Sequence, residues 1–306
     1  MQVACASPVF VPHAPLPLSR AQSAVRSTPA PSRVVSRAVR LSVTMSGVQP
    51  AVIVGGGRVG NAMFNLGDGS DTIVRRGEKI PAGTTGPIFV CTRNDVLEGI
   101  IEDCPPERRE DLVFLQNGML QQFLETKGLG SNTQALIYFA VAKMGEAPTD
   151  GVTDMNPEGL TAVTGKWADA LATRLQNGNL SCHVLGEAAF ATSMFEKLIW
   201  ISAFMLVGAS HKCSVGEVEI AHKAEVSALI QELCGGITAE KGVAFGAAPA
   251  ERLCAYARSV AHFPTAVKEF EWRNGYFYSL SEAAVAAGRA DPFPTHTAGL
   301  KGVGAI

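Results

Sequence analysis

Two features of this sequence have residue types and spacing that could do chemistry: a glycine-rich turn and a lysine inside an apolar segment. The turn follows the apolar run 51–54 and fits the pattern G-x-G-x-x-G. In that pattern the first glycine makes a tight turn, the second lets a pyrophosphate approach the backbone, and the third packs a helix on a strand. Backbone N–H groups at the helix start would meet the phosphate charge. The segment therefore predicts a dinucleotide site, with an ordinary glycine-rich turn as the alternative. The predicted contacts are Gly55, Gly56, Gly57, Arg58, Val59 and Gly60.

The lysine is Lys197, in the middle of a helix predicted over residues 187–209 that is apolar nearly all round. Burial lowers the pKa of a lysine, which suits a proton donor working near neutral pH. The alternative is a lysine that reaches the surface or pairs with a structural carboxylate.

A basic pair follows the second predicted strand, residues 71–74. Arg75 lies twenty residues after Gly55, and Arg76 is next to it. A free ribose 2′-hydroxyl calls for an acidic residue at this place, whereas a 2′-phosphate calls for arginine. The pair therefore favours NADP(H) over NAD, and two surface arginines in a turn are the alternative.

Strand and helix patterns alternate up to Gly186, as a parallel sheet requires. The connection between Arg76 and Ile88 holds eleven residues, which is too short for a crossover helix. Asn117 comes just after a predicted strand, and ligands bind at the carboxyl ends of such strands, so Asn117 is a site candidate. The predicted strands cover residues 51–54, 71–74, 88–91, 112–115, 135–141, 159–164 and 181–185.

Long helical patterns without strands begin at residue 187. The expected fold class is α/β, with a Rossmann-type parallel sheet domain over 46–186 followed by an all-helical substrate or dimerisation domain over 187–306. Gly235 and Gly236 should weaken or kink one of its helices. The predicted helices cover residues 187–209, 223–233, 250–262, 265–273 and 276–287, with a final helix after the loop 291–294.

Composition excludes several classes of function. A net charge of -2 over 306 residues argues against nucleic acid as a partner. Seven scattered cysteines and six histidines show no metal-binding spacing, so no bound metal is expected. The cysteines are expected to be free thiols. The longest apolar run, residues 198–209, is shorter than the roughly 18 to 20 residues that a bilayer needs, so no membrane span is expected.

The first 45 residues contain five arginines, seven serines and six prolines, with neither Asp nor Glu. That composition is typical of an organelle transit peptide, with a plain disordered tail as the alternative. Six prolines disfavour the amphipathic helix of a mitochondrial presequence. We therefore expect import into the chloroplast stroma, with a mitochondrial location as the alternative and cleavage near Met45.

Four motifs together resemble those of the ketopantoate reductase (2-dehydropantoate 2-reductase) family. They are the glycine turn, the segment 116–119, the segment 195–198 with 213–218, and Glu269 ahead of the Asn-Gly pair 274–275. The resemblance implies a Rossmann domain and a helical domain that reduce a 2-keto acid with NADPH in the cleft between them. It implies that Lys197 is the general acid, that Asn117 helps place the nicotinamide, and that Glu269 holds the substrate hydroxyl.

The same resemblance assigns the 2′-phosphate to Arg75 or Arg76 and places Arg93 near a residue that contacts the cofactor. The sequence also departs from the family. Ile201 and Met205 stand where the family has asparagines that contact substrate, with Ser202 the nearby polar group. The family serine that grips the carboxylate is missing at its usual spacing, and Ser259 is the substitute.

The sequence thus predicts an NADP-dependent oxidoreductase whose partner is a small 2-keto acid. The first candidate reaction is reduction of ketopantoate to pantoate, in pantothenate biosynthesis. One alternative is a catalytically silent dinucleotide-binding sensor or scaffold. Another is a reductase of a bulkier, less polar substrate, since aliphatic side chains replace two amides. A homodimer through the helical domain is left open.

Overall fold

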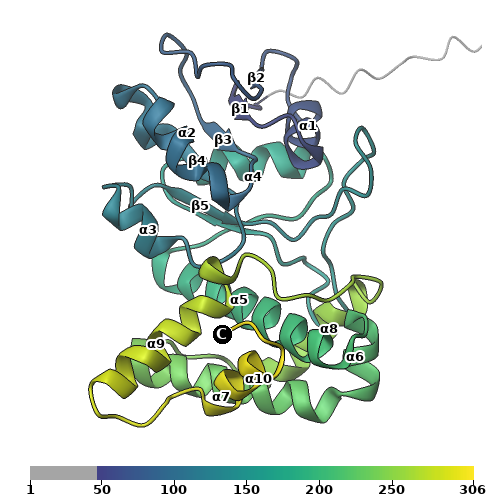
Figure 1. Ribbon diagram of the computed structural model, residues 1–306. Coiled ribbons are helices and arrows are strands. Elements are labelled where there is room, and N and C mark those ends of the chain that lie inside the picture. Colours follow the sequence, from purple (N-terminus) through teal and green to yellow (C-terminus); the bar gives the residue numbers. More distant parts are fainter. Residues whose placement is uncertain (1–46) are drawn as a thin grey trace, which may run out of the picture. The chain divides into compact units, whose positions relative to one another are not determined.

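The computed structural model describes residues 47–306, which belong to one compact unit of the chain. The predicted transit peptide and its cleavage site near Met45 lie outside the described residues. Residues 47–186, here the sheet part, hold all the strands, and residues 187–306, here the helical part, are all-helical (Figure 1).

Seven strands form one sheet in the order β2-β1-β3-β4-β5-β6-β7. Every neighbouring pair is parallel except β5 and β6, which run antiparallel. The long connection 137–161 carries the chain back without a crossover helix, so β6 enters the sheet in the reverse direction. The Rossmann-type class is confirmed, and the sheet is mostly rather than wholly parallel. The strands are β1 (Val52–Val54), β2 (Thr72–Val74), β3 (Ile88–Val90), β4 (Leu112–Phe114), β5 (Thr133–Leu136), β6 (Ala162–Thr164) and β7 (His183–Val184).

Helices cover both faces of this sheet. Alternate residues of a strand point to opposite faces, so Ile53 packs with one pair of helices while Val52 and Val54 pack with the other. The first face is covered by α1 (Arg58–Asn65) and α4 (Ala168–Asn177), and the second by α2 (Leu97–Asp103) and α3 (Gln121–Thr126). Both faces of the central strands are therefore buried, which explains their continuous apolar runs.

No helix lies between β2 and β3, as the short connection predicted. The short 3₁₀ helix η1 (Asn94–Val96) precedes α2, and η2 (Pro106–Asp111) precedes β4. Arg108 holds the connection from η2, donating to the carbonyls of Thr84 at 2.6 Å and Gly86 at 2.7 Å while pairing with Asp111 at 2.7 Å. Arg108 thus holds the connection between β2 and β3 in place, where no crossover helix packs.

A second arginine fastens the far end of the sheet. Arg174 of α4 is fully buried and donates to both carboxylate oxygens of Asp71, at 2.5 and 2.9 Å, and to the carbonyls of Met63 and Gln49. The same carboxylate accepts the N–H of Ala51 at 2.8 Å. This pair ties α4 to the amino ends of β1 and β2.

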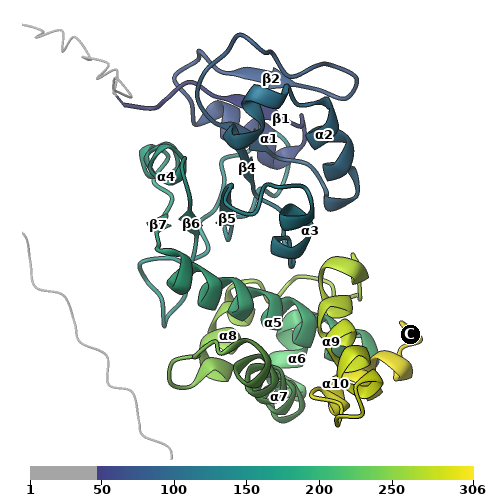
Figure 2. The ribbon, with the colours of Figure 1, turned by 90° about the vertical axis from the view of Figure 1, so that its left-hand side faces the viewer.

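The helical part is built around α5, which lies along the side that meets β5 and β6 (Figure 2). Its central position confirms the predicted buried helix. On length and composition α5 could also cross a membrane, with a mean hydropathy of 1.4 in its most apolar window, but 67% of that window is buried within the fold. The helices are α5 (Glu187–His211), α6 (Val215–Ala221), α7 (Lys223–Lys241), α8 (Pro249–Ser259), η3 (Phe270–Trp272), α9 (Asn274–Ala286) and α10 (Pro294–Gly302).

Two predicted features of the helical part are wrong. Helix α7 continues through Gly235 and Gly236 to Lys241 instead of ending near residue 233. A Cβ at Gly236 would lie 2.1 Å from the Phe293 ring, so this glycine lets the helix pack closely on that ring. The helix predicted over 265–273 is absent apart from η3. Pro264 forms a bridge with Ser214, and Glu269 has a φ of +48°, which no right-handed helix accommodates.

Candidate active site

Lys197 reaches from α5 to the carboxyl end of the sheet. Its side chain is buried, and its ammonium group donates to the carbonyl of Ile137 at 2.5 Å, just after β5 ends. The same nitrogen lies 4.3 Å from the ring centre of Tyr138. The glycine-rich turn follows β1, which runs parallel to β3, and strands β3, β4 and β5 are parallel in turn. Lysine and turn therefore share one edge of the sheet, where such sheets bind ligands.

The surroundings of Lys197 make its proton easy to give up. Burial, with a further contribution from the positive charge of Arg273, lowers the pKa of Lys197 from 10.5 to about 7. A lysine with that pKa exists in both protonation states near neutral pH, which is the condition for efficient general acid catalysis. The hydrogen bond to Ile137 and the contact with the Tyr138 ring hold the ammonium group in one place.

The loop after β4 forms the next wall of the site. Gly118 has a φ of +113°, and a Cβ there would lie 2.5 Å from the carbonyl oxygen of Trp272. The N–H of Met119 donates to that same carbonyl at 2.7 Å. The backbone carbonyl of Asn117 accepts from Asn94 at 3.0 Å, while the Asn117 side chain makes no hydrogen bond within residues 47–306. The loop is thus fixed from both sides and leaves the Asn117 amide for a ligand.

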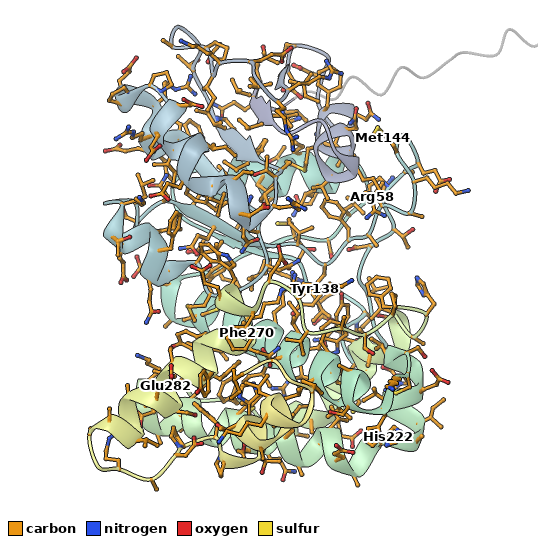
Figure 3. The ribbon with its side chains drawn as sticks, viewed as in Figure 1. Arg58, Tyr138, Met144, His222, Phe270 and Glu282 are labelled. Carbon is orange, nitrogen blue, oxygen red and sulfur yellow. The ribbon has the colours of Figure 1, made fainter. Side chains whose placement is uncertain are left out.

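The segment around η3 closes the site from the helical part. Glu269 forms an ion pair with Arg273, so one carboxylate oxygen of the predicted substrate-binding residue is already engaged. Tyr276, at the start of α9, lies against Phe195 of α5, with ring centres 6.0 Å apart. Figure 3 shows Tyr138 and Phe270 near the boundary of the sheet and helical parts.

The three glycines of the turn have the three environments that the motif requires. Gly55 has a φ of +112°, and a Cβ there would lie 2.8 Å from the carbonyl oxygen of Cys91. A Cβ at Gly60 would lie 1.8 Å from the carbonyl oxygen of Gly55, so α1 packs closely on the turn. Gly57, the residue before α1, has no atom within 4 Å of its Cβ position and offers open backbone to a phosphate.

Arg58 and Val59 support the turn through contacts with other segments. The side chain of Arg58 donates to the carbonyls of Val141 and Ala142, both at 3.1 Å, and so holds the segment after β5. Val59 packs against the core between the sheet and helices α1 and α4. The side chain of Arg75 runs beside Gly56, with its Cγ 3.5 Å from the Cβ position of that glycine.

Arg75 and Arg76 are both exposed at the end of β2 and are open to a ligand phosphate. Arg93 differs, since its exposed guanidinium pairs with Asp95 two residues on, through hydrogen bonds of 2.5 and 3.1 Å. An arginine engaged by its own turn has less to offer a cofactor than the pair after β2, whose guanidinium groups have no partner within residues 47–306.

The two predicted serines have different surroundings. Ser202 has no exposed surface, and its hydroxyl lacks a partner among the described residues, so a substrate cannot reach it in this conformation. Ser259 is exposed at the end of α8 and donates to the carbonyl of Tyr256 at 2.8 Å. Ile201 is buried one turn beyond Lys197, which leaves that helix face apolar.

Three side chains with metal-binding atoms cluster elsewhere, a grouping that the sequence spacing did not indicate. The ring nitrogens of His211 and His222 lie 2.7 and 3.9 Å from one oxygen of Glu225, and the two rings stack 3.6 Å apart. The three side chains meet because His211 is the last residue of α5, His222 immediately precedes α7, and these two helices pack together. His222 lies well away from Tyr138 (Figure 3), so this cluster takes no part in the site around Lys197.

The mostly parallel sheet, the glycine turn and the helical part that supplies Lys197 define a Rossmann-type fold with a C-terminal helical part. No protein-family model and no curated protein sequence matches the chain. Solved structures do match.

A D-mandelate dehydrogenase with NADH and anilino(oxo)acetate is similar at a TM-score of 0.59 and 16% identity, over 84% of this chain and 98% of that one. The dimeric ketopantoate reductase from Staphylococcus aureus is similar at a TM-score of 0.55 and 17% identity, over 83% of this chain and 98% of that one. A probable 2-dehydropantoate 2-reductase from Bacillus subtilis is similar at a TM-score of 0.55 and 15% identity, over 83% of this chain and 100% of that one. The chain has the fold of these ketopantoate reductases, which confirms at the level of fold the resemblance that the motifs indicated.

Proposed function

We propose that this protein is a divergent ketopantoate reductase-like enzyme that reduces a 2-keto acid with NADPH, with ketopantoate as the first candidate substrate. The observation that carries the proposal is the buried Lys197, held by Ile137 at the edge of the sheet that also bears the glycine turn. The ketopantoate reductases and the D-mandelate dehydrogenase that share this fold support it.

A bound reduced nicotinamide would supply a hydride to the ketone carbon. As the new C–H bond forms, the electron pair of the C=O double bond moves to oxygen, and Lys197 gives that oxygen its proton. The products are the 2-hydroxy acid and the oxidised dinucleotide, and Lys197 regains a proton from solvent. Fixing the acid through Ile137 and Tyr138 and holding the reactants in one orientation supply the acceleration.

Ketopantoate and a small panel of 2-keto acids, tested with the full chain and NADPH by absorbance, examine the proposed function. Turnover of ketopantoate supports the pantothenate assignment. A direct NADPH titration runs beside it, because binding without turnover of any panel member would favour a silent sensor or scaffold.

A second candidate function, reduction of a less polar keto acid, is favoured by the apolar face next to Lys197. Ile201 is buried there, and Met205 packs against the same core. The D-mandelate dehydrogenase with this fold was solved with anilino(oxo)acetate, a ligand that bears a phenyl ring. A higher kcat/KM for an aryl-substituted 2-keto acid than for ketopantoate would select this candidate.

We expect Arg75 and Arg76 to select NADPH over NADH. Replacing both with alanine removes charge-assisted hydrogen bonds to the 2′-phosphate, each worth roughly 1.5–3 kcal/mol. The Kd for NADPH should rise at least about tenfold, while the Kd for NADH stays within about a factor of two. Fluorescence titration measures both constants. The exposed Arg289→Ala variant is the control for loss of charge. An equal rise in the Kd for NADPH and for NADH would show that these arginines do not recognise the 2′-phosphate.

The plastid location is a proposal that rests on the composition of residues 1–45. A fusion of residues 1–50 to a fluorescent protein should accumulate in chloroplasts when expressed in plant cells. Signal in mitochondria would select the alternative, and cytosolic signal would exclude both organelles.

A further inference from the structure

Arg273 belongs to the site, although no sequence motif singled it out. It follows Trp272, whose carbonyl accepts the N–H of Met119, so its backbone is tied to the loop that carries Asn117. Three residues later, Tyr276 packs on Phe195 of α5, two residues from Lys197. Contacts on both sides therefore place Arg273 between the loop after β4 and the lysine.

The guanidinium of Arg273 is only partly used by the protein. Its side chain is 16% exposed, and one terminal nitrogen pairs with Glu269. The Nε atom is buried and has no partner among the described residues. A guanidinium has five N–H donors in a planar fork, and leaving a buried donor unpaired costs about 1–3 kcal/mol. The guanidinium therefore has N–H donors that no described residue satisfies.

The charges of the site are unbalanced in the same sense. When Lys197 is protonated, the form in which it can act as an acid, Lys197 and Arg273 provide two positive charges and Glu269 provides one negative charge. The neighbouring acid on α5, Glu196, is already engaged by Arg252. One anion bound between Lys197 and Arg273 would make the group neutral, and a 2-keto acid carries one carboxylate next to its ketone.

We propose that Arg273 binds the carboxylate of the substrate and thereby restricts the enzyme to 2-keto acids over uncharged ketones and esters. This inference rests on the proposed function. Two parallel N–H···O bonds from the guanidinium fork would hold the carboxylate, and the adjacent ketone oxygen would then face Lys197. Glu269 is a positioning residue that holds Arg273, and Arg273 takes over the carboxylate role that the sequence assigned to Ser259.

The test compares Arg273→Met and Arg273→Lys with wild type and with the exposed Arg289→Met control. Kinetics use a 2-keto acid that wild type reduces and the methyl ester of the same acid. Loss of a buried charge partner costs about 2–5 kcal/mol, a factor of roughly 30 or more. Arg273→Met should lower kcat/KM for the acid by at least that factor, mainly through KM, and leave the ester within about threefold. Arg273→Lys should recover part of the loss, because a lysine keeps the charge without the fork.

A binding measurement separates this inference from the proposed function. Oxamate carries a carboxylate but no reducible ketone, so its titration into the NADPH complex needs no turnover. We expect oxamate to bind wild type and Arg289→Met alike, and Arg273→Met at least about 30-fold more weakly, at an unchanged Kd for NADPH. Equal oxamate binding by Arg273→Met, no oxamate binding by wild type, or equal losses for acid and ester would each overturn the assignment. If Arg273→Met is unstable, the double variant Glu269→Gln/Arg273→Met removes the unpaired carboxylate and gives the same reading.

Discussion

Replacing Lys197 with alanine should lower kcat for the 2-keto acid by roughly 10²- to 10⁴-fold, the usual contribution of a positioned general acid. The Kd for NADPH should stay within about threefold, because in the proposed complex the glycine turn and Arg75 would hold the dinucleotide at a different place on the sheet edge. Single-turnover kinetics at saturating NADPH separate the two effects. The matched control is Lys301→Ala, which removes an exposed lysine of α10. A loss of NADPH affinity as large as the loss of turnover would contradict the acid role.

The dependence of kcat/KM on pH also tests whether Lys197 acts as an acid. In the proposed mechanism protonated Lys197 is the active form, and burial lowers the pKa of Lys197 to about 7. The kcat/KM of wild type should therefore be flat below that pH and fall as pH rises through it. Removing the positive charge of Arg273 should move this fall to higher pH, since that charge contributes to lowering the Lys197 pKa. A profile that rises through neutral pH would make Lys197 a base instead.

Arg174→Met should destabilise the protein by about 3–5 kcal/mol, because it leaves the Asp71 carboxylate buried without its partner. Both side chains of this pair are fully buried, and the substitution also leaves the carbonyls of Met63 and Gln49 without their donor. Urea unfolding measures the change in free energy. Arg289→Met removes an exposed pair and should cost less than about 1 kcal/mol.

The double variant Asp71→Asn/Arg174→Met tests the reason for this loss. It removes the buried charge, so it should be more stable than Arg174→Met alone. A double variant less stable than Arg174→Met would show that packing around α4, rather than the unpaired charge, sets the cost.

The parts of the fold that depend on neighbouring residues could be predicted from the sequence. The glycine spacing predicted the turn, because Gly55 has a φ of +112° and Gly60 lets α1 pack closely on Gly55. The all-round apolar pattern predicted α5 and its buried lysine. The eleven residues before Ile88 predicted a connection without a helix, since chain length alone decides that point.

What the sequence could not indicate depends on contacts between distant segments. The glycines at 235 and 236 indicate a break in isolation, and only the Phe293 ring shows that the second one serves packing. The segment 265–273 has helical composition, but its backbone turns to meet Met119. The role proposed for Arg273 and the Asp71–Arg174 ion pair were not predicted for the same reason. The residues next to them in the sequence do not indicate which distant segment they contact.

The central claim is that hydride passes to the carbonyl carbon of a 2-keto acid, and isotope transfer tests it most directly. Full-length protein is incubated with NADPH deuterated at both C4 positions and with ketopantoate, and the hydroxy acid is analysed by mass spectrometry. We predict one deuterium at C2 of the product, absent when Lys197→Ala replaces wild type over the same time. A hydroxy acid without deuterium, or no product from any 2-keto acid although NADPH binds, would contradict the account.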